Sequence, residues 1–254
     1  MSNPGSSNTV DDDRLECTEK NTDALRNRPP SPDGCIALTF ERGYYHCDSL
    51  FIKRSLRPSE FRTSQRGLHI PRLGKERLQN EAESLRFIRR TTNIPVPTVH
   101  AALEVDDSFF LITDYIQGTS MSQLSEGQKR IVCIELRQHL ATLHAIKSNT
   151  TGGPSGLVIP PYRVMKCSVK DDWPIRSSDN AEYVFCHNDL SQPNVIVDPD
   201  TLKIRAIIDW EYAGFFPEYF EAPFYERLGP SVAIEGENDD VESLLKFLSI
   251  SPRE

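Results

Sequence analysis

The sequence of residues 183–214 is Tyr-Val-Phe-Cys-His-Asn-Asp-Leu-Ser-Gln-Pro-Asn-Val-Ile-Val-Asp-Pro-Asp-Thr-Leu-Lys-Ile-Arg-Ala-Ile-Ile-Asp-Trp-Glu-Tyr-Ala-Gly. It contains three short apolar runs, at residues 183–186, 195–197 and 204–208, whose β-branched side chains are typical of buried strands. The Asp-Pro-Asp-Thr segment between the last two runs favours a turn. We therefore expect a hairpin that brings Asn194 towards Asp209.

Polar side chains follow each of these runs. Asp189 lies five positions before Asn194, on a loop that Pro193 stiffens, so both can approach Asp209. Phosphoryl transfer needs Mg²⁺ bound by hard oxygen ligands, together with a carboxylate that orients the acceptor hydroxyl and takes its proton. The sequence therefore predicts a phosphoryl-transfer centre, with Asn194 and Asp209 on the metal and Asp189 as the base.

The order of these motifs resembles a known family. The stretch His187-Asn188-Asp189-Leu190 through Asn194, followed by Ile-Asp-Trp-Glu at residues 208–211, is similar to the aminoglycoside phosphotransferase family of the protein-kinase-like superfold, and to a fungal-type small-molecule kinase within it. The spacing from Asp189 to Asn194 is that of the kinase catalytic loop. The resemblance implies Mg²⁺, ATP (or GTP) as co-substrate, and a His187 that orders the loop by hydrogen bonding.

The beginning of the chain is compatible with a nucleotide-covering hairpin. Two β-prone runs, residues 35–40 and 49–53, are separated by residues 41–46, and the whole predicts a hairpin that begins a small sheet. The Gly-x-Gly-x-x-Gly loop of protein kinases is missing, and Gly43 alone offers close backbone approach to a phosphate.

The resemblance also implies a lysine and an acidic partner for the phosphates. Leu-Phe-Ile-Lys at residues 50–53 resembles the strand that carries the phosphate-binding lysine, although Lys53 could instead be a surface residue at a strand end. Apolar residues at three- and four-residue steps predict an amphipathic helix over residues 76–90. Glu81 beside its apolar stripe is the expected partner of Lys53, with Glu83 as the alternative.

A connection between two lobes is expected near residue 114. The segment Ser108 to Asp114 predicts a strand, and Asp114, Tyr115 and Ile116 lead out of it into a turn. In a kinase-like fold, the backbone of this hinge pairs with the adenine edge. These three residues are therefore the expected nucleotide-base contacts, although an ordinary strand end is equally compatible with the sequence.

The second half of the chain is less uniform. Residues 122–146 contain a second predicted amphipathic helix, residues 147–181 are expected to be irregular and without a helix, and residues 241–248 predict a last short helix. Glu211 follows Asp209 by two positions and either ligates a second cation or begins a helix. The aromatic segment at residues 215–225 is expected to pack against the catalytic hairpin.

Composition sets the remaining bounds. With 38% hydrophobic and 26% charged residues and no run long enough for a membrane span, the chain is expected to be a soluble, cytoplasmic, globular protein. A net charge of −8 argues against a nucleic-acid partner. The six cysteines show no Cys-x-x-Cys pair and no histidine at metal spacing, which indicates buried or free thiols.

These expectations combine into one architecture. We predict an α+β, two-lobed protein-kinase-like fold, with a disordered tail at residues 1–32, an N-lobe of antiparallel sheet and one helix at 33–116, and a mainly helical C-lobe with the catalytic hairpin at 117–254. The expected activity is transfer of the γ-phosphate of ATP (or GTP) to a hydroxyl-bearing small molecule, without membrane or nucleic-acid partners. The acceptor and the oligomeric state stay open.

Two other functions are compatible with the sequence. The missing glycine loop and the short 147–181 region leave open a catalytically inactive nucleotide-binding protein or scaffold of the same fold. A protein kinase ranks lowest, because no Asp-Phe-Gly or Ala-Pro-Glu segment is present.

Overall fold

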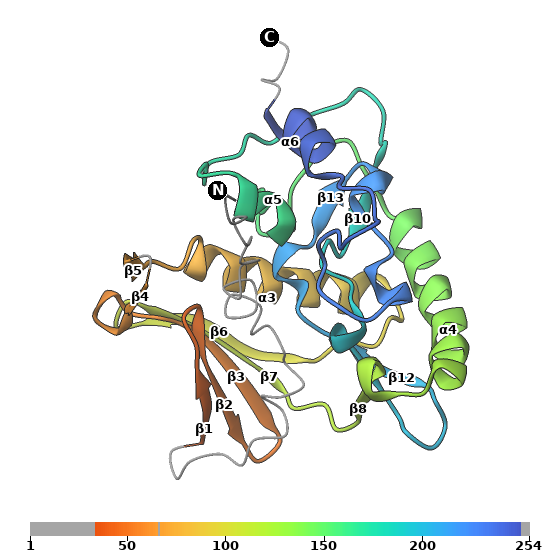
Figure 1. Ribbon diagram of the computed structural model, residues 1–254, viewed down its shortest axis with the longest axis horizontal. Helices are drawn as coiled ribbons and strands as arrows, with labels where there is room; N and C mark the ends of the chain where they lie inside the picture. The colour runs from red at the N-terminus through yellow and green to blue at the C-terminus, as the bar shows by residue number, and fades with distance from the viewer. Residues whose placement is uncertain (1–33, 66, 250–254) are drawn as a thin grey trace, which may run out of the picture.

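The computed structural model describes residues 34–65 and 67–249. The predicted tail at residues 1–32 lies outside these residues. A five-stranded antiparallel sheet and helix α3 occupy the N-terminal part, and helices α4 to α6 with two three-stranded sheets form the rest (Figure 1). Among the residues described, no helix combines the length and the apolar character that crossing a bilayer requires.

The strands are β1 Cys35–Leu38, β2 Arg42–Cys47, β3 Leu50–Ser55, β4 Arg62–Ser64, β5 Gly67–His69, β6 Val99–Val105, β7 Ser108–Asp114, β8 Thr119–Ser120, β9 Lys147–Ser148, β10 Tyr183–Cys186, β11 Val195–Val197, β12 Ile204–Ile207 and β13 Gly214–Phe216. The helices are α3 Gly74–Thr91, α4 Glu126–Ala145, α5 Tyr162–Cys167 and α6 Val241–Ser249. Six short 3-10 turns complete the described chain: η1 Pro58–Glu60, η2 Met121–Gln123, η3 Gln192–Asn194, η4 Trp210–Tyr212, η5 Glu218–Phe220 and η6 Phe224–Glu226.

The large sheet has the strand order β1-β2-β3-β7-β6, so β3 lies at its centre. Lys53 of β3 pairs with Tyr44 on one side and with Leu111 on the other. A residue on a central strand is held by neighbours on both sides. The sheet therefore gives Lys53 a fixed backbone position.

One expectation for this sheet is wrong. Residues 41–46 were expected to connect two strands, but Arg42–Cys47 is itself strand β2, paired with both β1 and β3. The physical reason is that its aromatic side chains suit a pleated surface better than a turn. The tight connection falls instead at Asp48, which adopts a left-handed conformation (φ 54°) between β2 and β3.

Helix α3 forms where the periodic pattern predicted it, and it lies between the sheet and the rest of the chain (Figure 1). The apolar stripe is fully buried, and its members Leu78 and Ala82 pack against Phe109 and Leu111 of β7. Thr92, at the C-terminal cap of the helix, is extended, and its hydroxyl accepts from the Ile94 backbone N–H at 3.1 Å. Side-chain burial at this interface fixes the helix, and with it Glu81, against the central strands.

Helix α4 lies within the predicted range of residues 122–146 and begins at a capping box. The Ser125 hydroxyl accepts from the Gln128 backbone N–H, and the Gln128 carboxamide accepts from the Ser125 backbone N–H. The helix then buries the predicted face. That face contributes Val132, Leu136, Leu140 and Leu143 to the main core.

The segment at residues 147–181 is not wholly irregular, and this corrects a second expectation. Residues 162–167 form the short helix α5, which starts directly after Pro161 and buries Arg163, Val164 and Met165. A helix of six residues is too short to produce a repeating apolar pattern, and it depends on tertiary packing. Its contacts with α6 provide that packing.

Candidate active site

The hairpin of β11 and β12 forms as predicted. Val195 pairs with Ile207, and the backbone N–H of Ile208 donates to the Asn194 carbonyl at 3.0 Å. The turn is fixed by the Asp198 carboxylate, which accepts from the backbone N–H groups two and three residues later. Asn194, at the start of one strand, therefore lies beside the end of the other, where Asp209 follows.

The loop before this hairpin holds Asp189 close to Asn194. The side-chain amide nitrogen of Asn194 donates to the Asp189 carbonyl at 2.8 Å, and both residues are buried. Asn188, one position earlier, adopts a left-handed conformation (φ 66°), and its side chain donates to the Tyr212 carbonyl. The loop is thus tied to the hairpin at one end and to the segment after Asp209 at the other.

His187 orders this loop through both of its ring nitrogens. The Asp189 backbone N–H donates to Nδ1 at 3.2 Å, which leaves Nε2 to donate to the Ile208 carbonyl at 2.9 Å. Burial lowers the pKa of His187, so the ring is neutral, in agreement with this tautomer. With both nitrogens bonded to the backbone, His187 is placed to hold the loop.

Lys53 reaches the same place from the opposite side. Its ammonium donates to Glu81 Oε1 at 2.6 Å and also to Asp209 Oδ1. Burial alone would lower the pKa of Lys53, but the charges of Asp209 and Glu81 outweigh it and raise the pKa. Glu83, the alternative partner, is bonded to Arg86 at the surface. The structure therefore brings Lys53, Glu81 and Asp209 together.

A second buried ion pair lies beside this one. Glu211 accepts from Arg42 of β2, and Arg77 of α3 lies 3.8 Å from its other oxygen. Arg42 and Lys53 share one face of the sheet, since Arg42 stands two residues before the Tyr44 that pairs with Lys53. Glu211 starts no α-helix; it sits in the 3-10 turn η4, with its carboxylate paired to arginine.

Two members of the site, Arg42 and Arg77, were not predicted from the sequence. Arg42 falls in the segment that was expected to connect two strands. Only in a strand, where side chains alternate between the two faces, does it share a face with Lys53. No spacing links either arginine to Glu211, which is 169 residues from Arg42. Together, three buried cations and three carboxylates from β2, β3, α3 and residues 209–211 meet here, and Arg77 also donates to Glu41 at the edge of the cluster.

The predicted hinge lies at the end of β7, next to a pocket. The Asp114 and Tyr115 backbone N–H groups donate to the carbonyls of Thr98 and Ser49, at 3.1 and 2.7 Å. The Asp114 carboxylate accepts from the Thr98 N–H and contacts His100. Asp114 is therefore tied into the sheet by both its backbone and its side chain.

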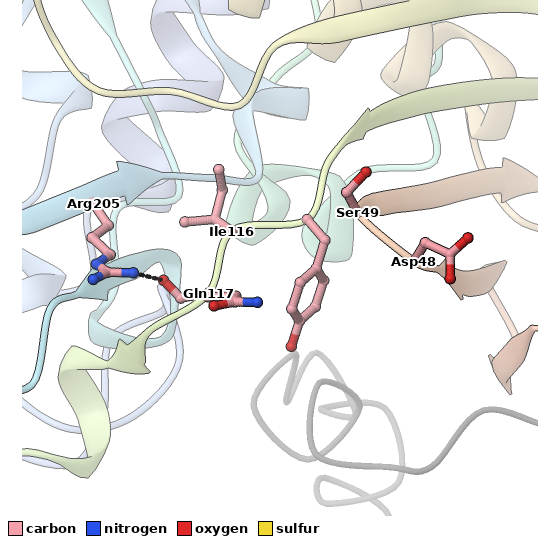
Figure 2. Close-up of a pocket in the computed structure, with 6 residues that line it drawn as sticks. Asp48, Ser49, Ile116, Gln117 and Arg205 are labelled. Carbon is pink, nitrogen blue, oxygen red and sulfur yellow. Dashed lines mark hydrogen bonds between the residues drawn. The ribbon is translucent and has the colours of Figure 1, made fainter.

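The pocket encloses about 600 Å³ (Figure 2). It is lined by Asp48, Ser49, Tyr115, Ile116, Gln117 and Arg205. Arg205 donates to the Gln117 carbonyl at 3.2 Å across its rim, and Tyr115 stacks on His46 with ring centroids 3.9 Å apart. Ile116 packs against a small core cluster that contains Ile208, the residue before Asp209. Strand β3 connects the two places, because Ser49 of the pocket directly precedes it and Lys53 lies on it.

Comparisons with known proteins match two parts of the chain. Residues 166–222 match the model described as phosphotransferase enzyme family, and residues 71–155 match the model of fructosamine kinase. No curated protein gave a sequence match.

Solved structures that are similar to this chain include aminoglycoside phosphotransferases. The aminoglycoside phosphotransferase APH(3'')-Id from Streptomyces rimosus is 17% identical, with 83% of this chain and 80% of that chain covered, at a TM-score of 0.52. An aminoglycoside-3'-phosphotransferase of type VIII is 20% identical, with 76% and 77% covered, at a TM-score of 0.48. The first of these matches, with the antiparallel N-terminal sheet, confirms the two-lobed kinase-like α+β fold.

Proposed function

We propose a specific reaction for this chain. The two family matches and the fold support its place among the aminoglycoside phosphotransferase and protein-kinase-like enzymes, as a small-molecule kinase. The proposed reaction moves the γ-phosphate of ATP (or GTP) to a hydroxyl of a small molecule. The observation that carries it is the meeting of Lys53, Glu81 and Asp209 beside the loop that holds Asp189 and Asn194.

Asn194 and Asp209 are the proposed Mg²⁺ ligands, and their donor atoms fit that ion. The side-chain nitrogen of Asn194 is used by the Asp189 carbonyl, so its oxygen is the atom left for a cation. A carboxylate and a carboxamide oxygen are the hard donors that Mg²⁺ prefers. When bound, the ion neutralises charge that develops on the phosphates.

Asp189 is the proposed base. It lies in the loop that His187 and Asn194 fix through hydrogen bonds to its backbone, so its carboxylate is held in a defined place. From there it orients the acceptor hydroxyl and takes the proton at the hydroxyl oxygen as the phosphoryl group is transferred. The protein contributes position and charge rather than a covalent intermediate.

Lys53 and the hinge are the proposed nucleotide contacts. Glu81 orients the Lys53 ammonium, which moves from Asp209 to phosphate oxygens when nucleotide binds. Lys53 lies four residue steps, roughly 13 Å, along the chain from Ser49 at the pocket. This span suits an extended nucleotide. Because the N–H groups of Asp114 and Tyr115 bond within the sheet, the base is proposed to contact the Tyr115 and Ile116 side chains instead.

Two substitutions test the roles separately. Asp189→Ala should abolish phosphate transfer and preserve nucleotide binding, whereas Asp209→Ala should weaken binding of Mg²⁺-nucleotide. Asp200→Ala, at the exposed tip of the hairpin turn, is the matched control and should change neither. Turnover is measured by nucleotide consumption against a panel of hydroxylated metabolites and antibiotics, and binding by calorimetry. Retained turnover in Asp189→Ala would remove the base assignment.

A second candidate function is nucleotide binding without catalysis. It is favoured by the missing Gly-x-Gly-x-x-Gly loop and by the direct bond from Arg42 to Glu211, which occupies the carboxylate considered for a second cation. Thermal shift with and without Mg²⁺-ATP, followed by a nucleotide-hydrolysis assay, separates the two. A shift without any turnover across the acceptor panel identifies the binding protein.

A further inference from the structure

A cluster of metal-ligating side chains lies beneath the catalytic loop, apart from the ionic site. His144 comes from the last turn of α4, Cys186 from the end of β10, and Glu221 directly follows η5. One ligand atom of each lies within 4.8 Å of the other two. The three residues come from separate elements, so no spacing in the sequence predicts that they meet.

Two of these ligand atoms lack the hydrogen bonds that their burial requires. Within residues 34–65 and 67–249, neither His144 Nε2 nor Glu221 Oε1 has a hydrogen-bond partner, although both atoms are buried. The Cys186 thiol, which is completely buried, makes long hydrogen bonds to backbone carbonyls, at 3.6 and 4.0 Å. Buried polar atoms without partners cost about 1–3 kcal/mol each. These atoms are therefore available to bind one common group.

The other atoms of the same side chains are already oriented. His144 Nδ1 lies 3.5 Å from the Glu218 carboxylate, and the second oxygen of Glu221 accepts from the His187 backbone N–H. A histidine whose far nitrogen faces a carboxylate is the usual support for a metal-bound imidazole. His144 Nε2 and Glu221 Oε1 are thus the atoms available to an ion, since the other atom of each side chain already has a partner.

The charges and donor types select the ion. A thiolate, a carboxylate and a neutral imidazole balance one divalent cation, so the filled site is neutral among the apolar side chains around Cys186. Sulfur and nitrogen donors together favour Zn²⁺ over Mg²⁺ or Ca²⁺. Bonds of about 2.0–2.3 Å place tetrahedral ligands some 3.3–3.8 Å apart. From separations of up to 4.8 Å, the three ligand atoms need to close by up to about 1.5 Å.

We propose that His144, Cys186 and Glu221 form a zinc site. Binding replaces the thiol proton of Cys186 with a Zn–S bond and releases that proton to solvent. The ion links α4, β10 and the segment after η5, and through Glu221 it reaches the backbone of His187 at the head of the catalytic loop. The site is structural, and it is independent of whether the neighbouring loop transfers phosphate.

The test measures metal binding by the full chain, not activity. Metal-free protein is prepared with a chelator and titrated with Zn²⁺ against a chromophoric competitor, and with Co²⁺ while the near-ultraviolet charge-transfer band of a cobalt–thiolate bond is followed. The wild type should bind one Zn²⁺ per chain and show the band with Co²⁺. Cys186→Ser should lose the band and weaken Zn²⁺ binding by more than roughly 100-fold.

Cys133→Ser is the matched control, because Cys133 is also a buried thiol and lies on α4 outside the cluster. It should keep the band and the stoichiometry. If Cys186→Ser does not fold, His144→Gln, whose side chain is partly exposed, serves in its place and should weaken Zn²⁺ binding by a similar factor. The proposal is overturned if the wild type shows no thiolate band, if the band persists in Cys186→Ser, or if the wild type binds well under one Zn²⁺ per chain.

Discussion

Replacing Lys53 by methionine removes the cation at the centre of the buried cluster and leaves two carboxylates facing each other. Lys53 and Glu81 are 6% and 3% exposed, so water replaces little of the lost interaction. Breaking a buried ion pair by deleting one partner costs about 3–5 kcal/mol. We use the lower figure, about 3 kcal/mol, because burial raises the pKa of Glu81 and so eases its protonation once the lysine is gone.

The expected change can be measured by thermal and urea unfolding of the nucleotide-free protein. For a chain of this size, each kcal/mol shifts Tm by about 2–4 °C, so Lys53→Met should lower Tm by about 6–12 °C. Lys203→Met is the control, since Lys203 is 73% exposed at its side chain, and it should change Tm by no more than about 1–2 °C.

A double mutant separates the ion pair from general loss of packing. Lys53→Met combined with Glu81→Leu replaces the pair by apolar side chains, and it should recover about 2 kcal/mol relative to the sum of the single variants. The reasoning is refuted if Lys53→Met is as stable as the Lys203→Met control. Additivity of the two single effects would equally contradict a direct Lys53–Glu81 interaction.

Three further outcomes follow from the structure. Burial alone would raise the pKa of Glu41, but its hydrogen bond to histidine and two arginine charges lower the pKa to about 2. Glu41→Gln should therefore lower the free energy of unfolding at pH 7 by about 1 kcal/mol, a figure discounted for the exposure of the side chain. In urea unfolding, this difference in stability from the wild type should vanish as the pH falls from about 4.5 through 2. Gly214→Ala should destabilise the protein by about 1–3 kcal/mol, because the new Cβ meets backbone atoms at 2.8 Å. Gly127→Ala, which has open space around it in helix α4, should stabilise the protein by about 0.5–1 kcal/mol. Equal Tm values for the two variants would contradict this. Arg42→Ala should lower Tm because it leaves the Glu211 carboxylate buried without its main partner, by about 3 kcal/mol, and an unchanged Tm would exclude that pair.

Local chemistry made much of this fold predictable. The β-branched runs and the Asp198 turn predicted the β11–β12 hairpin, and apolar spacing predicted α3 and α4, because in each case the pattern indicates a face that must be buried. The error at residues 41–46 arose from charged and glycine residues that resemble a connection, although the aromatic residues among them favour a strand. Helix α5 had no repeating pattern to detect.

The candidate site was predictable only where its residues lie close in sequence or follow a family motif. The spacing of Asp189, Asn194 and Asp209 could be seen directly, and the lysine and its glutamate followed from order along the chain. Arg42 and Arg77 could not be found, because their partner Glu211 is more than a hundred residues away and only the folded sheet and helix bring them together. The same holds for the proposed zinc ligands.

The most direct test of the account is the Mg²⁺ dependence of ATP binding, measured by calorimetry with Mg²⁺ and with excess chelator, in the wild type and in Asp209→Asn. If Asp209 and Lys53 border one metal–nucleotide pocket, Mg²⁺ should tighten ATP binding by the wild type more than roughly tenfold, about 1.4 kcal/mol, and this gain should disappear in the variant. Equal ATP affinity with and without Mg²⁺ in the wild type, or an undiminished gain in Asp209→Asn, would contradict the account.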